Sequence, residues 1–309
     1  MRSLGGWLEL AEPAWTRRRH PSVIGPRFGF PMAQRMQISA EKRAPAWPDG
    51  ARSAVCFTFD LDAEEVWLVD EEGAAERPAV LSQGTYGPRV ALPLILGILA
   101  RHGVRGTFFV PGRVAERHPA SVAAILEAGH EIAHHGYSHR SPATLAPDEE
   151  RRELEAGLEA LAGRGVVATG YRAPGWDVSP RTIDLVAELG FAYSSNLMDD
   201  IAPYVHAGAG IVELPVHWTL DDAPHFWFSP STWTKAIASA AHVAGLWKEE
   251  ADGIARLGGL CVYTCHPQII GRPGRLGVLE AAIAAAVDQK DRWVATAGEV
   301  AAWVKRSSR

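Results

Sequence analysis

Short apolar runs alternate with amphipathic segments from about residue 46 to the end of the chain. The run SAVCFTF at 53–59 predicts a buried strand, the segment 90–103 predicts a helix ending at Gly103, and 105–110 predicts a second strand. The alternation then repeats, with further strands predicted over 130–135, 169–174, 192–196, 211–218 and 259–267, and further helices over 119–129, 147–165, 179–190, 232–256 and 276–288. Ser179 is the predicted N-cap of the helix over 179–190. Seven or eight strands alternating with helices indicate an α/β fold with a parallel sheet, wound open or closed as a barrel.

Polar residues at the predicted strand ends favour the barrel. In a barrel the carboxyl ends of the strands converge on one face, whereas an open sheet spreads them along a crevice. No dinucleotide-binding or Walker A loop is present, which weakens the open-sheet alternative. The residues at these ends are Asp60 and Asp62, His135 and His139, Arg172, and His266.

The chain divides into an N-terminal extension, 1–45, and one catalytic barrel, 46–309. The extension has no clear periodicity, and a mobile arm, an arm that clasps an oligomer and an overextended gene start all remain open. No apolar run approaches the roughly 18 residues of a membrane span, and charges and prolines interrupt the N-terminus where a signal peptide has an apolar core. We therefore expect a cytoplasmic protein without a membrane partner.

Charge and cysteine content limit the partners and the compartment. A net charge of −5 and a pI near 6.2 offer no broad basic surface, so we expect no nucleic-acid partner. Cys261 and Cys265 lie in one predicted strand, about 13 Å apart, which is too far for a disulfide. Cys56 could pair with either across neighbouring strands, but three buried thiols in a reducing compartment is the simpler interpretation.

The segment EIAHHGYSHRS at 131–141 suggests a metal site. On a helical turn the spacing of His135 and His139 would put two imidazoles within reach of one ion, although two polar residues on a solvated turn is the alternative. Asp60 and Asp62 share strand parity, so one carboxylate could bind the metal while the other acts as a base; a strand that simply emerges into solvent is the alternative here. We expect His134 to have a packing or supporting role.

Four motifs together carry a family resemblance. TFDLD, HGYSH, YRAPGW and YTCHP occur in the order and at the approximate separations found in NodB-type polysaccharide deacetylases, carbohydrate esterase family 4. The chain resembles that superfamily over about 50–300, and most closely its signal-less cytoplasmic branch of peptidoglycan-deacetylase-like proteins, cyclic imide hydrolases and allantoinase-like proteins. The resemblance implies a single distorted (β/α) barrel, TIM-like, with one divalent metal ion, usually zinc, and a homo-oligomer.

The resemblance also assigns roles by position. Asp62, His135 and His139 would be metal ligands, Asp60 the general base and His266 the general acid. Further positions are Arg172, which orients the base; Gly175, whose backbone N–H would face the oxyanion; and Trp176, which would contact substrate. Outside these motifs, Asp199 in SNLMDD is a further candidate for substrate contact, with a simple loop residue as the alternative.

Two departures from the family pattern affect these roles. Gly175 stands where an aromatic residue is usual, with Trp176 next to it. Asp221 and Asp222 both could pair with His266; we place Asp222 with the catalytic residues and Asp221 with the substrate-binding ones, and the sequence does not decide between them.

These features predict a metal-dependent hydrolase of non-peptide carbon–nitrogen bonds that acts on a glycan or a small molecule. The leading interpretation is a deacetylase of N-acetylated amino sugars or peptidoglycan-type substrates. The alternatives are a hydrolase of small cyclic imides or ureides, and a catalytically idle barrel with a binding role. The aromatic segment 221–233 could form a lid or an oligomer contact; a closed pocket capped by 218–233 would favour an imide.

Overall fold

The core of the protein is one curled sheet flanked by helices. The computed structural model describes residues 45–228 and 236–308, so the predicted extension lies almost entirely outside the described residues. Residues Arg43–Arg309 form one compact unit. The strands of this unit are β1 (Ser53–Asp60), β2 (Thr107–Val110), β3 (Glu131–His134), β4 (Gly170–Tyr171), β5 (Tyr193–Ser194), β6 (Tyr204–Val205), β7 (Val212–Glu213), β8 (Leu260–Cys265) and β9 (Arg292–Val294).

The sheet is almost entirely parallel. Its order is β6-β7-β5-β4-β3-β2-β1-β8, with β9 paired to β1, and only β6 and β7 run antiparallel within the described part of the chain. The hydrogen-bonded path does not close between β6 and β8. Instead, Asp221 forms a single parallel bridge with Thr264 of β8. The predicted α/β fold is confirmed, and the barrel is a strongly curled, mostly parallel sheet that is distorted and incompletely paired.

Strand β1 lies in the interior of the sheet, and every one of its residues is buried. It pairs with β8 from Ala54 to Phe59 and with β2 from Thr58 to Asp60. Val55, Phe57 and Phe59 belong to the cluster that packs under the helices, whereas Ala54 and Cys56 belong to a second cluster on the other side of the sheet. Since side chains alternate between the two faces of a strand, Thr58 and Asp60 lie on the same side as Ala54 and Cys56. The carboxylate of Asp60, at the end of β1, therefore faces the inside of the curled sheet.

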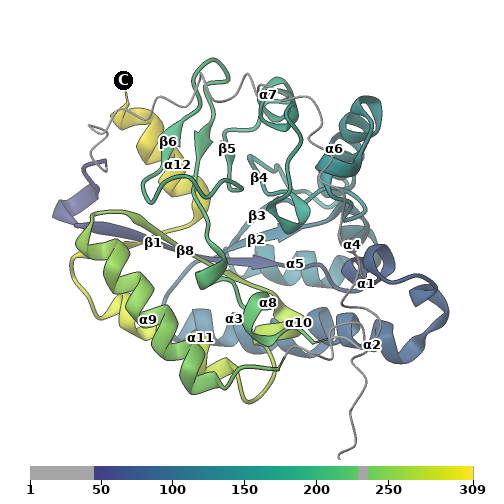
Figure 1. Cartoon of the computed structure of the whole chain (residues 1–309), viewed down its shortest axis with the longest axis horizontal. Coiled ribbons are helices and arrows are strands. Elements are labelled where there is room, and N and C mark those ends of the chain that lie inside the picture. The colour runs from purple at the N-terminus through teal and green to yellow at the C-terminus, as the bar shows by residue number, and fades with distance from the viewer. Residues whose placement is uncertain (1–44, 229–235, 309) are drawn as a thin grey trace, which may run out of the picture. The chain divides into compact units, whose positions relative to one another are not determined.

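Helices pack on both sides of the sheet. In Figure 1, α9 and α11 run side by side near β1 and β8, and α12 lies on the other side of these strands. The helices are α1 (Glu65–Asp70), α2 (Pro78–Tyr86), α3 (Leu92–Arg101), α4 (Gly112–Arg117), α5 (Pro119–Glu127), α6 (Pro147–Ala162), α7 (Thr182–Glu188), α8 (Ala223–Phe226), α9 (Ala240–Arg256), α10 (Pro267–Ile270), α11 (Leu276–Val287) and α12 (Ala297–Ser307). Of the helices in the described ranges, none is long and apolar enough to cross a membrane.

Several predicted boundaries differ from the structure. The helix predicted from Ser179 begins at Thr182, with Arg181 at the N-cap position. The Ser179 hydroxyl accepts from the backbone N–H of Arg181 in the preceding turn and donates to the buried Glu150 carboxylate. The helix predicted over 232–256 is α9, which begins at Ala240; 229–235 lie outside the described residues. Helices α1 and α2 were not predicted, since their segment lacks a clear apolar stripe.

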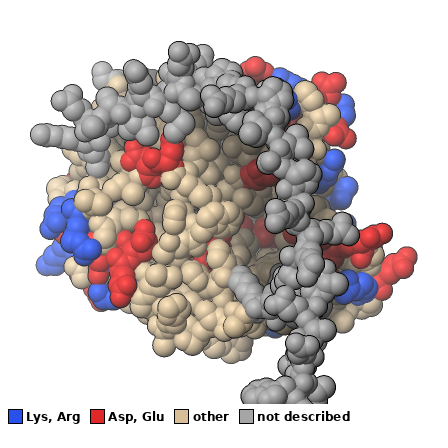
Figure 2. All heavy atoms as spheres, viewed as in Figure 1, with Lys and Arg blue, Asp and Glu red and all other residues tan. Residues whose placement is uncertain are grey.

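The distribution of surface charges and the state of the cysteines agree with the expectations from the sequence. On the face in Figure 2, the described Lys and Arg side chains lie mostly at the rim, in small groups interspersed with acidic ones. Cys56, Cys261 and Cys265 are all buried and free, as the strand spacing predicts for the last two.

Candidate active site

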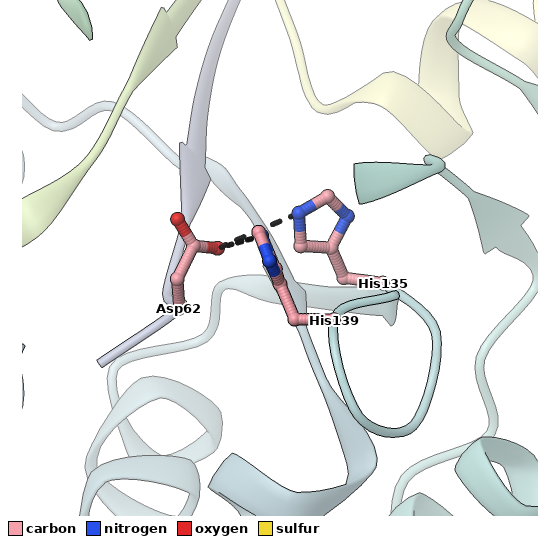
Figure 3. A group of neighbouring side chains, drawn as sticks. All are labelled: Asp62, His135 and His139. Carbon is pink, nitrogen blue, oxygen red and sulfur yellow. Dashed lines mark ion pairs between the residues drawn. The ribbon is translucent and has the colours of Figure 1, made fainter. Parts of the chain in front are cut away.

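Two histidines and one carboxylate converge at the carboxyl ends of β1 and β3. Oδ1 of Asp62 lies 3.4 Å from Nε2 of His135 and 3.5 Å from Nε2 of His139. Figure 3 shows both rings directed toward this one oxygen, from the loop after β3. The three side chains form a group that could hold a metal ion, as predicted.

The loop after β3 gives the two histidines their orientation. The predicted helical turn is wrong, because Gly136 and His139 have φ angles of 74° and 61° and the segment is not helical. A positive φ at a histidine is uncommon and is found where the surrounding structure holds it. Nδ1 of His135 donates to the Arg172 carbonyl at 2.8 Å, which leaves Nε2 as the atom that faces Asp62.

The geometry fits a small divalent cation. Three ligands at zinc-type distances on a tetrahedron are separated by about 3.4 Å, close to the spacings around Asp62 Oδ1. This oxygen is buried and has no hydrogen-bond partner among the described residues, which is costly unless a cation binds it. Burial raises the pKa of Asp62, but the rings of His139 and His135 lower it well below its usual value. The carboxylate is therefore in the charged form that a metal ion requires.

Asp60 forms a buried ion pair beside this cluster. Its Oδ1 accepts from Nη1 of Arg172 at 2.7 Å, and its Oδ2 lies 3.9 Å from Nε2 of His135. Arg172 is completely buried; it also donates to the hydroxyl groups of Thr58 and Ser195, and its guanidinium lies 4.0 Å from the centre of the Phe109 ring. Asp60 is thus held next to the cluster without being part of it.

His266 faces the cluster from the end of β8. Its Nε2 lies 3.7 Å from Oδ2 of Asp62, and its Nδ1 lies 2.6 Å from Oδ1 of Asp222. The backbone N–H of His266 donates to the other Asp222 oxygen, so Asp222 is the aspartate that pairs with His266. Burial lowers the pKa of His266, but Asp222, Asp221 and Asp62 outweigh this and hold it well above its usual value.

Asp221 has a different environment from its neighbour. Its Oδ1 accepts from the backbone N–H of Ala223, and it lies 3.7 Å from Nδ1 of His266. Burial, opposed by His266, raises the pKa of Asp221 to about 7. Asp221 also lines the cavity described next, where a substrate could reach it.

A cavity of about 500 Å³ opens over these groups. Trp176 is buried in its wall and lies 4.4 Å, centre to centre, from the ring of Trp218, which is 43% exposed. Gly175 and Trp176 have φ angles of 61° and 57°, so the turn after β4 is unusual at a tryptophan. The other lining residues include Asp60, Asp62, His135, His139, Asp70, Arg140, Ser141, Thr144, Asp177, Asp221, Trp227 and His266.

One predicted substrate contact lies elsewhere. Asp199 is exposed, accepts a hydrogen bond from the Tyr204 hydroxyl and is not among the residues that line the cavity. Trp218, Asp221 and Trp227 from the predicted cap do line it, while the last part of the cap, 229–233, lies outside the described residues.

Sequence reasoning missed the residues that support the Arg172 turn. Glu213 of β7 is fully buried and accepts from the backbone N–H groups of Asn196 and Leu197, at 2.6 and 2.9 Å. The Asn196 side chain in turn accepts from the backbone N–H of Ala173 at 2.7 Å. This chain of bonds fixes the segment on which Arg172 and Gly175 lie. A buried glutamate in a strand of the pattern VELP was the available signal.

His134 has the predicted packing role. Its ring is fully buried, and Nε2 donates to the Leu154 carbonyl at 3.0 Å while Nδ1 accepts from the backbone N–H of Gly136. A Cβ atom at Gly157 would lie 2.2 Å from Nε2, so this contact requires glycine in α6. His134 therefore ties the end of β3 to α6 and points away from the metal group.

Known proteins share both the sequence and the fold. The polysaccharide deacetylase family model matches residues 82–194. A peptidoglycan deacetylase of Helicobacter pylori is 29% identical over 251 residues, which is 71% of this chain and 85% of that protein. A peptidoglycan deacetylase-like protein of Gibberella zeae is 26% identical over 64% of this chain and 68% of its own length.

The solved structures extend this likeness to more than four fifths of the chain. The crystal structure of a putative polysaccharide deacetylase from Mycobacterium smegmatis is 44% identical, with a TM-score of 0.83 over 86% of this chain and 94% of that one. The allantoinase PuuE shares the fold, with a TM-score of 0.74 and 22% identity over 85% of this chain and 94% of that one. The family model and the 44% identity over 94% of the mycobacterial chain show that this chain belongs to the polysaccharide deacetylase family.

Proposed function

We propose that the protein is a zinc-dependent deacetylase that removes the acetyl group from N-acetylated amino sugars of a peptidoglycan-type glycan or its soluble precursor. The proposal rests on membership of a family of hydrolases that act on carbon–nitrogen bonds, and on the names of the relatives from Helicobacter pylori and Gibberella zeae. Zinc is the proposed metal because two imidazoles and one carboxylate are a ligand set that suits it well.

One observation carries the proposal. Asp62, His135, His139, Asp60 and His266 all line one cavity, and Arg172 and Asp222 hold Asp60 and His266 from behind its wall. Hydrolysis of an amide needs an activated water, stabilisation of the oxyanion and a proton for the leaving nitrogen. The three groups are suited to these three needs, and each is built from a different pair of sheet segments.

Each residue has a separate role in the proposed reaction. A divalent cation held by Asp62, His135 and His139 would polarise the scissile carbonyl and lower the pKa of the attacking water. Asp60 then accepts the proton of that water, with its carboxylate held in place by Arg172. His266, kept protonated by Asp222, donates a proton to the leaving nitrogen. Gly175 lines the cavity, and its backbone N–H would donate to the oxyanion, as the resemblance to the family implies.

The cavity suits a sugar ring better than an apolar ligand. Trp176 and Trp218 offer aromatic faces, and Arg140, Ser141 and Asp177 offer hydrogen-bonding groups on the same wall. Most pockets for small ligands combine such apolar faces with a few polar groups that orient the ligand.

The test joins metal content to a hydrolysis screen. Asp62→Ala and His135→Ala are expected to lose bound zinc in elemental analysis, whereas His242→Ala, a change of an exposed histidine in α9, is expected to retain it. Stoichiometric metal in both ligand variants would overturn the ligand assignment. The wild-type protein should release acetate from N-acetylglucosamine oligomers; turnover of succinimide-type imides or ureides alone would instead identify it as an imide or ureide hydrolase.

A further inference from the structure

Gln268 is a buried polar residue directly behind the candidate metal group. It lies in α10, two residues after His266, and only 3% of its surface is exposed. Its Nε2 donates to Oδ2 of Asp62 at 3.4 Å. Because a charged carboxylate can only accept hydrogen bonds, the NH₂ group of the amide must be the part that faces it.

The two carboxylate oxygens of Asp62 therefore have different neighbours. Oδ1 faces both His135 and His139 and has no hydrogen-bond partner among the described residues. Oδ2 faces Gln268 and lies 3.7 Å from Nε2 of His266. A carboxylate can bind a metal ion through one or both oxygens, and a donor on one oxygen favours binding through the other.

The surrounding helices allow Gln268 to come this close. The helix α10 packs against a π-helical turn, η5 (Gly87–Ala91), an uncommon element often found near functional sites. A Cβ atom at Gly87 would lie 3.2 Å from Oε1 and 3.3 Å from the backbone nitrogen of Gln268, and one at Gly271 would lie 2.2 Å from the Cβ atom of Ala91. The Tyr86 hydroxyl donates to the Gly271 carbonyl at 2.9 Å, which adds a hydrogen bond between the end of α2 and the residue that follows α10.

We propose that Gln268 is a positioning residue that holds Asp62 so that only Oδ1 is presented to the metal ion. The π-helical turn and the two glycines serve this role, because they seat α10 close to the end of β1. The hydroxyl or amide of a shorter residue at this position would not reach the carboxylate. The inference rests on the metal-binding part of the proposed function and does not depend on which substrate is used.

The donor of Gln268 can be removed while its volume is nearly kept. In Gln268→Leu and Gln268→Met, we expect zinc affinity, measured by competition with a chelator, to fall about 10- to 100-fold. We also expect the absorption bands of the cobalt-substituted protein to shift, since Asp62 would be free to bind through both oxygens. The matched control is Gln289→Leu, which changes an exposed glutamine and should leave affinity and spectrum as in the wild type.

The outcomes separate this inference from the proposed function. Thermal unfolding of the metal-free proteins shows which variants keep their fold, and zinc affinity is compared only among the folded variants. Two substitutions of Gln268 are used so that the comparison still holds if one of them misfolds. Wild-type affinity and an unchanged cobalt spectrum in a folded variant would overturn the role of Gln268. If the wild-type protein itself bound neither zinc nor cobalt, the metal site of the proposed function would fail as well, whereas failure to deacetylate any sugar would leave the Gln268 result standing.

Discussion

The Asp222 carboxylate holds His266 with both of its oxygens, one on Nδ1 of the ring at 2.6 Å and one on the backbone N–H at 2.9 Å. The ring can therefore turn only its Nε2 toward the cavity. Asp222 itself is fixed from the other side, because its own backbone N–H donates to the Thr264 carbonyl of β8. This double attachment fixes both the direction and the charge of the imidazole.

Asp222→Asn should leave a smaller fraction of His266 protonated at neutral pH while keeping the imidazole in place. The neutral amide no longer favours the protonated ring, so the pKa of His266 falls. Because the reaction needs the protonated form, the alkaline limb of the kcat/KM profile should move to lower pH by about one unit or more, and kcat should fall on the order of a hundredfold. A pH profile measured on an N-acetylglucosamine oligomer checks both effects. An alkaline limb that stays in place would show that His266 is not the acid.

Asp221→Asn is the matched comparison for that variant. The pKa of Asp221 is raised to about 7, so its carboxyl is largely neutral below that pH and replacement by a neutral amide should change little there. Above pH 7 the wild-type group is charged and supports the protonated form of His266 from 3.7 Å. We expect a smaller shift of the alkaline limb, in the same direction. An equal or larger shift than in Asp222→Asn would reverse the roles of the two residues.

Asp60→Asn should keep the metal and lose turnover. Asp60 lies beside the three ligands but pairs with Arg172, so metal content should equal that of the wild type, while kcat should fall about 10²- to 10⁴-fold. The change also leaves a buried guanidinium without its charge partner, which should lower the free energy of unfolding by about 3 kcal/mol. Elemental analysis, kinetics and urea unfolding measure the three effects. Asp62→Asn is the contrasting variant, since it should lose the metal; full activity of Asp60→Asn would remove Asp60 as the base.

The strand pattern predicts the carboxylates well because β1 is a continuous buried run. Parity along such a run decides which side each residue faces, so Asp60 and Asp62 could be placed together from sequence. The roles of Arg172 and His266 came from the family resemblance. No local pattern could show that Arg172 reaches across the curl to the end of β1, because that contact joins residues 112 positions apart.

Other features depend on tertiary contacts that no periodicity records. The choice between Asp221 and Asp222 is decided by the bridge of this segment to Thr264, and a shift of one residue would exchange them. The positive φ of His139 likewise comes from its loop, whereas its spacing from His135 suggested a helix. The cytoplasmic location, the homo-oligomer and the role of 1–45 stay predictions.

Glu213→Ala should loosen the turn that carries Arg172 without touching the cavity. The change leaves the N–H groups of Asn196 and Leu197, and the His206 ring, without their buried acceptor. We expect a loss of about 3 kcal/mol in the free energy of unfolding and a lower kcat with nearly intact metal content. Urea unfolding, kinetics and elemental analysis check this, with the exposed Glu159→Ala as control. Unchanged kcat in a clearly destabilised protein would limit Glu213 to a structural role.

His134 should make the fold sensitive to acid. Burial lowers the pKa of His134 to about 3, from a usual value of 6.5. Between these values the unfolded chain binds a proton that the folded protein does not, so stability is lost as the pH falls below 6.5, by about 1.4 kcal/mol per unit from this group. In His134→Gln the amide can donate to Leu154 and accept from Gly136 without titrating. Urea unfolding of the metal-free proteins at pH 7.5 and 5.0 should therefore show the wild type losing about 2 kcal/mol more than the variant. The exposed His242→Gln should follow the wild type; equal losses in His134→Gln and the wild type would mean that His134 is protonated in the folded protein.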